Sequence, residues 1–194
     1  MKKLLSIALM ALMVLPAFAG KTPKNWNFVN NDENECVVDR SFETSKTDAE
    51  SAIKAVRAAM NKQNLDAATI LSEEEGKIVY QIRKNTQSRY NPFAGMFQEY
   101  MEFRMTATFA EGKINLHIDE MTLQNLYAGF GAKVNTEGFS GKIDAYNQAV
   151  ETAATAKGKA KKEAQELIEE INDSFNSCQE EFDKILDIIQ NTVK

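Results

Sequence analysis

The sequence predicts an α+β protein, in which an antiparallel sheet carries helices on one face and a long helical segment follows. Segments of alternating apolar and polar residues, joined by Glu-Gly turns, occupy the middle of the chain. Segments with apolar residues at three- and four-residue steps precede and follow them. The chain has 194 residues. That length is enough to bury one sizeable core without a disulfide framework or a metal.

Residues 1–19 have the pattern of a secretory signal peptide. Lys2 and Lys3 precede an apolar run over 4–15, and Ala-Phe-Ala at 17–19 is a cleavage sequence. The run is shorter than the roughly 20 residues of a permanent membrane span, and no second run of that length follows. We therefore expect a mature chain with no integral membrane segment, in the periplasm or outside the cell.

A disordered leader is expected over 20–35, because this segment is polar and aperiodic. The α+β domain is expected over 36–156. Alternation predicts its first strand at 36–44. A helix over 48–64 follows, since Thr47 to Glu50 have capping-box spacing and apolar residues recur behind them at helical steps.

Two hairpins with similar turns come next. Glu75-Gly76 and Glu111-Gly112 each separate two alternating segments, and glycine supplies the positive φ that a tight turn requires. The four predicted strands are 68–74, 77–84, 99–110 and 113–120. If Glu111-Gly112 is a two-residue turn, six pairs of residues face each other across the two strands. These pairs are Phe109 with Ile114, Ala107 with Leu116, Met105 with Ile118, Thr108 with Asn115, Thr106 with His117, and Arg104 with Asp119. In every pair an apolar residue faces an apolar one or a polar residue faces a polar one, and the two residues of the charged pair have opposite signs.

Helical patterns fill the chain from Gly141 to its end. A first apolar stripe stops near Gly158, and from Ala164 a heptad seam runs over about four repeats. The seam residues are Ala164, Ile168, Ile171, Phe175, Cys178, Phe182, Ile185 and Ile189. We therefore expect a heptad-patterned helical extension over 157–194. The pattern leaves open whether 141–192 is one helix or two, and whether the seam packs within the chain, as a coiled coil with a second copy, or on another protein.

This order of elements resembles a family of secreted bacterial proteins, the domain of unknown function 4468, with a fold like that of the TATA-box-binding protein. The residues that carry the resemblance are Val37 to Phe42, the helix from Asp48 to Met60, and the Glu-Gly-Lys-Ile sequences at 75–78 and 111–114. The resemblance covers about residues 36–125, or up to 155 with the next helix. It implies a sheet covered by helices in the order β-α-β-β-β-β-α, and it implies no activity.

Charge and composition restrict the partners. The chain has 28 Asp and Glu residues against 23 Lys and Arg residues, a net charge of −5 that becomes more negative without Lys2 and Lys3. An acidic surface repels phosphate backbones and anionic lipids, so nucleic acid is not an expected partner. No motif for a cofactor or a metal is present.

The two cysteines, Cys36 and Cys178, have two interpretations. In an oxidising compartment they form a disulfide that closes a long loop. Alternatively, both are buried free thiols that pack as small apolar side chains.

His117 is the only histidine, and it is the only candidate for histidine-dependent catalysis. The predicted register places Arg104 and Asp119 near it, which suits a base oriented by a carboxylate. The sequence places no serine or cysteine nucleophile beside it. A strand histidine among Thr and Asn residues is more typical of a solvated sheet face.

Two long segments between the predicted elements, 85–98 and 121–139, carry aromatic residues. The candidate binding residues are Tyr90, Phe93, Phe97, Tyr127 and Phe130. Aromatic side chains on surface loops anchor partners, but they also fold back to cap an open core.

The sequence therefore favours a periplasmic or secreted, non-enzymatic module that binds a protein or a cell-envelope component. One alternative is an enzyme of the hydrolase type that uses His117. The other is a structural homo-oligomer assembled through residues 164–192.

Overall fold

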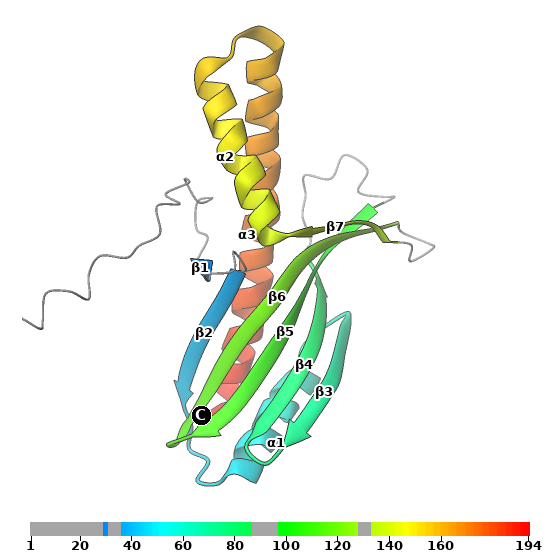
Figure 1. Ribbon diagram of the computed structural model, residues 1–194. Helices are drawn as coiled ribbons and strands as arrows, with labels where there is room; N and C mark the ends of the chain where they lie inside the picture. Colours follow the sequence, from blue (N-terminus) through cyan, green and yellow to red (C-terminus); the bar gives the residue numbers. More distant parts are fainter. Residues whose placement is uncertain (1–28, 31–35, 87–96, 128–132) are drawn as a thin grey trace, which may run out of the picture.

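The computed structural model describes residues 29–30, 36–86, 97–127 and 133–194 (Figure 1). The predicted signal peptide and most of the predicted leader lie outside these residues. The described elements are β1 Val29–Asn30, β2 Cys36–Glu43, α1 Ala49–Asn61, β3 Ala67–Glu74, β4 Lys77–Asn85, β5 Phe97–Ala110, β6 Lys113–Tyr127, β7 Lys133–Gly138, α2 Phe139–Thr155 and α3 Gly158–Val193.

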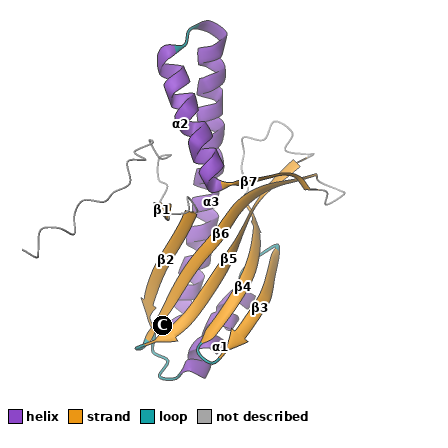
Figure 2. Cartoon of the chain, in the orientation of Figure 1, coloured by secondary structure: helices purple, strands orange, loops and turns teal. Residues whose placement is uncertain are grey.

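The strands form one antiparallel sheet with helices on one face, as the sequence predicts (Figure 2). The strand order is β1-β2-β6-β5-β4-β3, and β7 pairs with β6 beyond this path. Consequently β3 is the outer strand of one edge and β1 that of the other. Val29 and Asn30 pair with Val37 and Cys36, so these two residues of the predicted leader belong to the sheet.

Both predicted hairpins are confirmed. In the second, all six predicted pairs between β5 and β6 are present, and the strands are joined by Glu111-Gly112. Both turn residues have positive φ, 53° and 73°, as a type I′ turn requires. In the first hairpin, Glu74 pairs with Lys77 around Glu75-Gly76, and Gly76 has a φ of 73°.

The predicted loop at 121–139 is wrong, because strand structure continues through most of it. β6 extends to Tyr127 and pairs with β7, which the sequence prediction did not include. The reason is a bulge at Glu120, whose φ is 52°, with a register shift in the partner strand between Glu102 and Arg104. An extra residue moves the buried positions from even to odd numbers. The alternation therefore stops in the sequence although the strand continues.

The core lies between the sheet and the helices on its inner face. It combines side chains of β2, β4, β5 and β6 with those of α1, the first turns of α2, and α3 (Figure 1). Aromatic pairs join the layers: Phe103 of β5 meets Phe182 of α3 edge-on at 5.7 Å, and Phe139 of α2 stacks on Phe175 at 5.7 Å. Among the residues that the structure describes, no helix lies on the opposite face of the sheet (Figure 2).

The carboxyl-terminal segment is two helices, α2 and α3, separated at Ala156-Lys157. They form a hairpin whose closed end projects past the sheet (Figure 1). The structure differs from the expected separate extension over 157–194, because α3 crosses the inner face of the sheet from Ile171 to Val193. Seven of the eight seam residues are buried within the chain; Ile168 is half-buried. The seam thus packs internally.

Helix α1 is capped one residue later than its sequence pattern predicts. Asp48, not Thr47, is the N-cap residue, and its carboxylate accepts hydrogen bonds from the Ser51 amide and hydroxyl, both at 2.8 Å. These hydrogen bonds stabilise the charged form and lower the pKa of Asp48. Since Asp48 satisfies a free amide of the first turn, the capping box predicted around Thr47 is not needed.

Candidate functional site

The predicted catalytic candidates meet on the helix-free face of the sheet. His117 Nδ1 lies 2.8 Å from an Asp39 carboxylate oxygen, and its Nε2 lies 3.6 Å from Asp119. Arg104 donates two hydrogen bonds to Asp119, at 2.9 and 2.6 Å, and forms an ion pair with Glu120 at 2.7 Å. The register brings Arg104, His117 and Asp119 together as predicted, and β2 adds Asp39.

A shallow hollow of about 310 Å³ lies beside His117. It also contains Ser41, a hydroxyl nucleophile that sequence reasoning missed because the pairing of β2 with β6 is not local. The Ser41 hydroxyl donates its hydrogen bond to Asn115 at 2.8 Å, while both nitrogens of His117 face carboxylates. A serine nucleophile needs a base within hydrogen-bond reach. This arrangement lacks that pair and is typical of a solvated polar network.

The aromatic binding candidates are only partly placed. Tyr90, Phe93 and Phe130 lie outside the described residues. Phe97 and Tyr127 pair with each other at the ends of β5 and β6, so the structure places them in strands where the sequence predicts loops. The prediction that these five side chains bind a partner remains untested.

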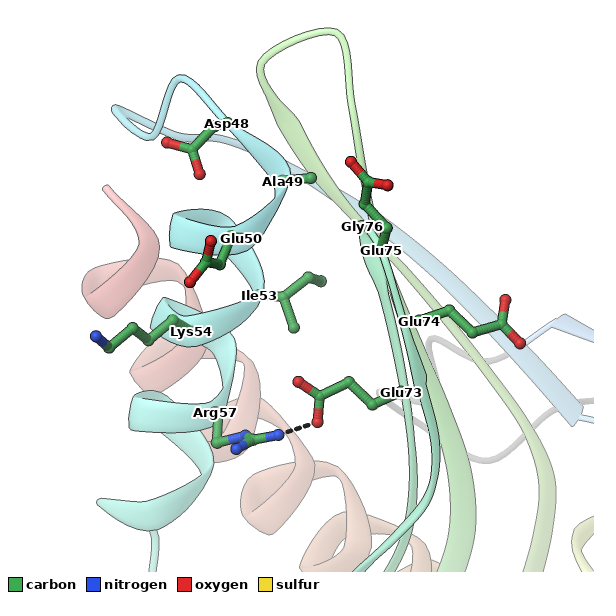
Figure 3. Close-up of a pocket in the computed structure, with 10 residues that line it drawn as sticks. All are labelled: Asp48, Ala49, Glu50, Ile53, Lys54, Arg57, Glu73, Glu74, Glu75 and Gly76. Carbon is green, nitrogen blue, oxygen red and sulfur yellow. Dashed lines mark hydrogen bonds and ion pairs between the residues drawn. The ribbon is translucent and has the colours of Figure 1, made fainter.

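A second hollow, the edge groove, lies between α1 and the turn end of β3 and encloses about 820 Å³ (Figure 3). We define it by its lining residues: Asp48, Ala49, Glu50, Ile53, Lys54, Arg57, Glu73, Glu74, Glu75 and Gly76. Ile53 and Ala49 come from the side of α1 that faces the sheet, while Glu73, Glu74 and Glu75 come from β3 and its turn. Sequence reasoning assigned these residues to a helix and a turn, but it did not predict that the two elements lie side by side.

Charge in the edge groove is unevenly distributed. Five of the lining residues are acidic and two are basic. Arg57 forms an ion pair with Glu73 across the groove and thereby joins α1 to β3, whereas the Lys54 side chain points away from the gap (Figure 3). The groove therefore has one crossing ion pair and an acidic end near the turn.

The groove continues along a free strand edge. β3 pairs only with β4 among the described strands, and every β3 residue after Ala67 is exposed. Ile70 and Leu71 are the two large exposed apolar residues of the described sheet, at 43% and 54% exposure. A register shift between Ile70 and Ser72 leaves Leu71 as a bulge. An edge strand offers unpaired amide and carbonyl groups, so β3 is a surface on which another strand can pair.

Beneath this edge lies a buried hydroxyl. Tyr80 of β4 pairs with Ile70 and is 3% exposed. Its hydroxyl has no hydrogen-bond partner by distance and angle among the described residues. Burial raises the pKa of Tyr80, and the nearby Arg57 cation opposes the rise. The hydroxyl therefore lies close to Arg57, the residue that joins α1 to β3 through its ion pair with Glu73.

Cys178 is a free, buried thiol, which agrees with the second of the two interpretations for this residue. It lies midway along the inward face of α3, where it packs as a small apolar side chain. Burial raises its pKa well above the usual value, the Glu99 carboxylate raises it further, and Lys142 opposes the rise. The thiol therefore stays protonated at neutral pH.

We expect native Cys178 to resist thiol reagents, because the thiolate is the reactive form and this thiol is neither charged nor accessible. The measurement uses a Cys36→Ser variant, so that Ellman's reagent reports one thiol at pH 8. Colour should develop only after guanidinium is added. Stoichiometric reaction within minutes in the native state would contradict the burial described above.

Within the described residues, no three His, Cys, Asp or Glu side chains are grouped so that they hold a metal ion. No helix in this part of the chain has the length and apolar character needed to cross a bilayer.

Two solved structures are similar to this chain. One is a TBP-like protein from Parabacteroides distasonis ATCC 8503, with 13% identity, a TM-score of 0.45, and coverage of 81% of this chain and 94% of the other. The second is a DUF4468 family protein from Bacteroides ovatus ATCC 8483, with 11% identity, a TM-score of 0.47, and coverage of 81% and 89%. These descriptions name the fold and family that the sequence resembles. The fold class itself follows from the strand order and helix positions above.

No protein-family profile matches the chain. No curated protein sequence matches it either.

Proposed function

We propose that this protein is a non-enzymatic module that acts in the periplasm or outside the cell and binds an extended polypeptide on the free edge of β3. One observation carries the proposal: β3 is exposed along its length, with Ile70 and Leu71 uncovered, and the edge groove separates its turn end from α1. An extended peptide that adds a strand to such an edge gains main-chain hydrogen bonds, and its alternate side chains enter the adjacent groove.

The two competing functions have less support. In the His117 network, carboxylates occupy the places beside both ring nitrogens, and the nearby Ser41 donates to Asn115. For an oligomer through α3, the apolar seam is already covered by the same chain. The β3 edge, in contrast, has backbone groups and apolar side chains that the described residues leave uncovered.

Hydrogen exchange tests the proposed strand addition. The probes are three synthetic octapeptides in which valine alternates with lysine, threonine or glutamate. Alternate amides of β3 point away from β4, and a bound strand should slow their exchange. Two further versions of a binding peptide carry N-methyl groups on odd or on even residues. Only the set that removes donors facing β3 should abolish binding. If no peptide protects residues 67–74, the proposal is wrong.

Matched truncations locate the apolar contact. Ile70→Ala should weaken peptide binding roughly five- to tenfold, since burial of apolar surface contributes about 25 cal/mol per Å². Leu167→Ala removes an apolar side chain of similar exposure, 39%, from α3, and should leave binding unchanged. Fluorescence anisotropy with labelled peptide measures both. Equal effects of the two substitutions would contradict a site on β3.

A further inference from the structure

The closed end of the α2–α3 hairpin carries a cluster of exposed positive charge. Residues 152–162 contain no acidic residue and four exposed lysines, which we call the basic tip: Lys157, Lys159, Lys161 and Lys162. Lys159 and Lys162 each form an ion pair with the glutamate four residues later, at 3.3 and 3.4 Å. Within the described residues, Lys157 and Lys161 form no ion pair. Positive charge is therefore available at this end of the molecule.

The stability of α3 does not account for the basic tip. The amino-terminal end of a helix has a partial positive charge, so acidic residues stabilise it and basic residues destabilise it. The first turn of α3 has no acidic residue, and the N-cap residue Lys157 makes no side-chain hydrogen bond to the helix. Natural sequences break such local rules mainly where function requires it. We therefore expect these lysines to serve an interaction.

The basic tip is separated from the acidic remainder of the chain. The hairpin projects past the sheet, and α3 first joins the core at Ile171 (Figure 1). Gly158 and Ile171 are thirteen residues apart, which is about 20 Å at the helical rise of 1.5 Å per residue. The Debye length is about 8 Å at physiological ionic strength. The negative charge of the sheet domain is thus largely screened at the tip.

The shape of the tip favours a broad, flat partner. Residues two positions apart do not share a face of a helix, so Lys159 and Lys161 point to different sides. A projecting end of this kind does not enclose a small anion, and an extended chain would contact only one side of it. A flat anionic surface, in contrast, meets lysines on all sides. Lysine is a hydrated point charge that suits such a diffuse field, whereas arginine suits bidentate recognition.

We infer that the basic tip docks this protein on the surface of an anionic phospholipid bilayer, with the closed end of the hairpin toward the lipid. The other residues of 152–162 are alanine, threonine and glycine, so the contact is electrostatic adsorption without insertion of large apolar side chains. The repulsion of anionic lipids expected from the net charge applies to the sheet domain. The inference concerns a surface separate from the β3 edge and does not depend on peptide binding there.

Co-sedimentation with vesicles tests this docking. The protein is the chain from Gly20 onward, which retains every described residue but lacks the apolar run at 4–15. It should bind vesicles of phosphatidylglycerol mixed with phosphatidylcholine, and not vesicles of phosphatidylcholine alone. Salt should release it, because the Debye length falls from about 30 Å at 0.01 M to about 3 Å at 1 M. Equal binding to both vesicles, or binding to soluble polyglutamate and to neither vesicle, would overturn the inference.

Matched double variants locate the contact. Lys157→Gln with Lys161→Gln should weaken vesicle binding about twenty- to thirtyfold, since each lysine near an anionic surface contributes roughly fivefold. Lys54→Gln with Lys62→Gln removes the same charge from exposed positions of α1, at the other end of the molecule, and should have little effect (Figure 1). Equal weakening by both variants would mean that net charge alone controls binding, and the inference would fail.

Thermal unfolding separates lost docking from lost structure. Removing positive charge at the start of α3 does not weaken the helix, so the Lys157→Gln, Lys161→Gln variant should unfold at the same temperature as the original chain or slightly higher. A folded variant that still binds anionic vesicles as tightly as the original chain would show that the basic tip is not the docking surface.

Discussion

Phe182→Ala is expected to lower the free energy of unfolding by about 3–5 kcal/mol, the range for truncating a fully buried phenylalanine. Its ring is 1% exposed and meets Phe103 edge-on at an interplanar angle of 68°. Phe182 lies on α3 and Phe103 on the central strand β5, so the truncation leaves a cavity between helix and sheet. Guanidinium unfolding followed by circular dichroism measures the change.

Leu167→Ala is the matched control, because Leu167 lies on the same helix but is 39% exposed. It should change the free energy of unfolding by no more than about 0.5–1 kcal/mol. If Phe182→Ala has an equally small effect, α3 is not part of the core. A helix that packs on a second copy or on another protein, two of the alternatives that the heptad pattern left open, predicts that small effect.

Local patterns explain why the hairpins were predictable. The β5–β6 pairing follows from a two-residue turn and from the alternation around it, and both are contained in about twenty consecutive residues. The same local information did not predict the bulge at Glu120 or the continuation of β6 beyond it. There one extra residue with a positive φ shifts the alternation, and the sequence shows no glycine to indicate the bulge.

Non-local pairing explains what the sequence did not predict. The edge groove exists because β3 is outermost in the sheet and α1 lies beside it, and strand order is not encoded by local periodicity. Ser41 lines the same hollow as His117 for the same reason, since β2 pairs with a strand more than seventy residues later. The seam of α3 was recognised as apolar, but its spacing is the same whether it packs on a sheet or on a second helix.

Glu99 lies at a position that the strand pattern assigns to the core. It is two residues before Met101, which is fully buried, and its own side chain is 9% exposed. Ser174 donates to the Glu99 carboxylate at 2.8 Å, and Thr86 also donates to it at 2.9 Å. Lys142 forms an ion pair with it at 3.5 Å. A buried carboxylate is tolerated when such partners satisfy it.

Glu99→Ala should therefore destabilise the fold by about 3–5 kcal/mol, because it leaves the Lys142 ammonium buried without its partner. The double variant Glu99→Leu with Lys142→Met should recover most of this loss, since apolar residues of similar size replace a buried ion pair at little cost. Glu163→Ala, which removes an exposed partner of Lys159, should cost no more than about 0.5 kcal/mol. Urea unfolding of all three variants measures these values.

The double variant distinguishes two sources of the expected loss. If the unpaired ammonium causes it, removing the charge of Lys142 restores stability, and the two positions are strongly coupled. If the loss instead comes from the hydrogen bonds of Ser174 and Thr86, the double variant stays as unstable as Glu99→Ala. That second result would mean that Glu99 stabilises the joint between the sheet and α3 through its hydroxyl partners and not through the ion pair.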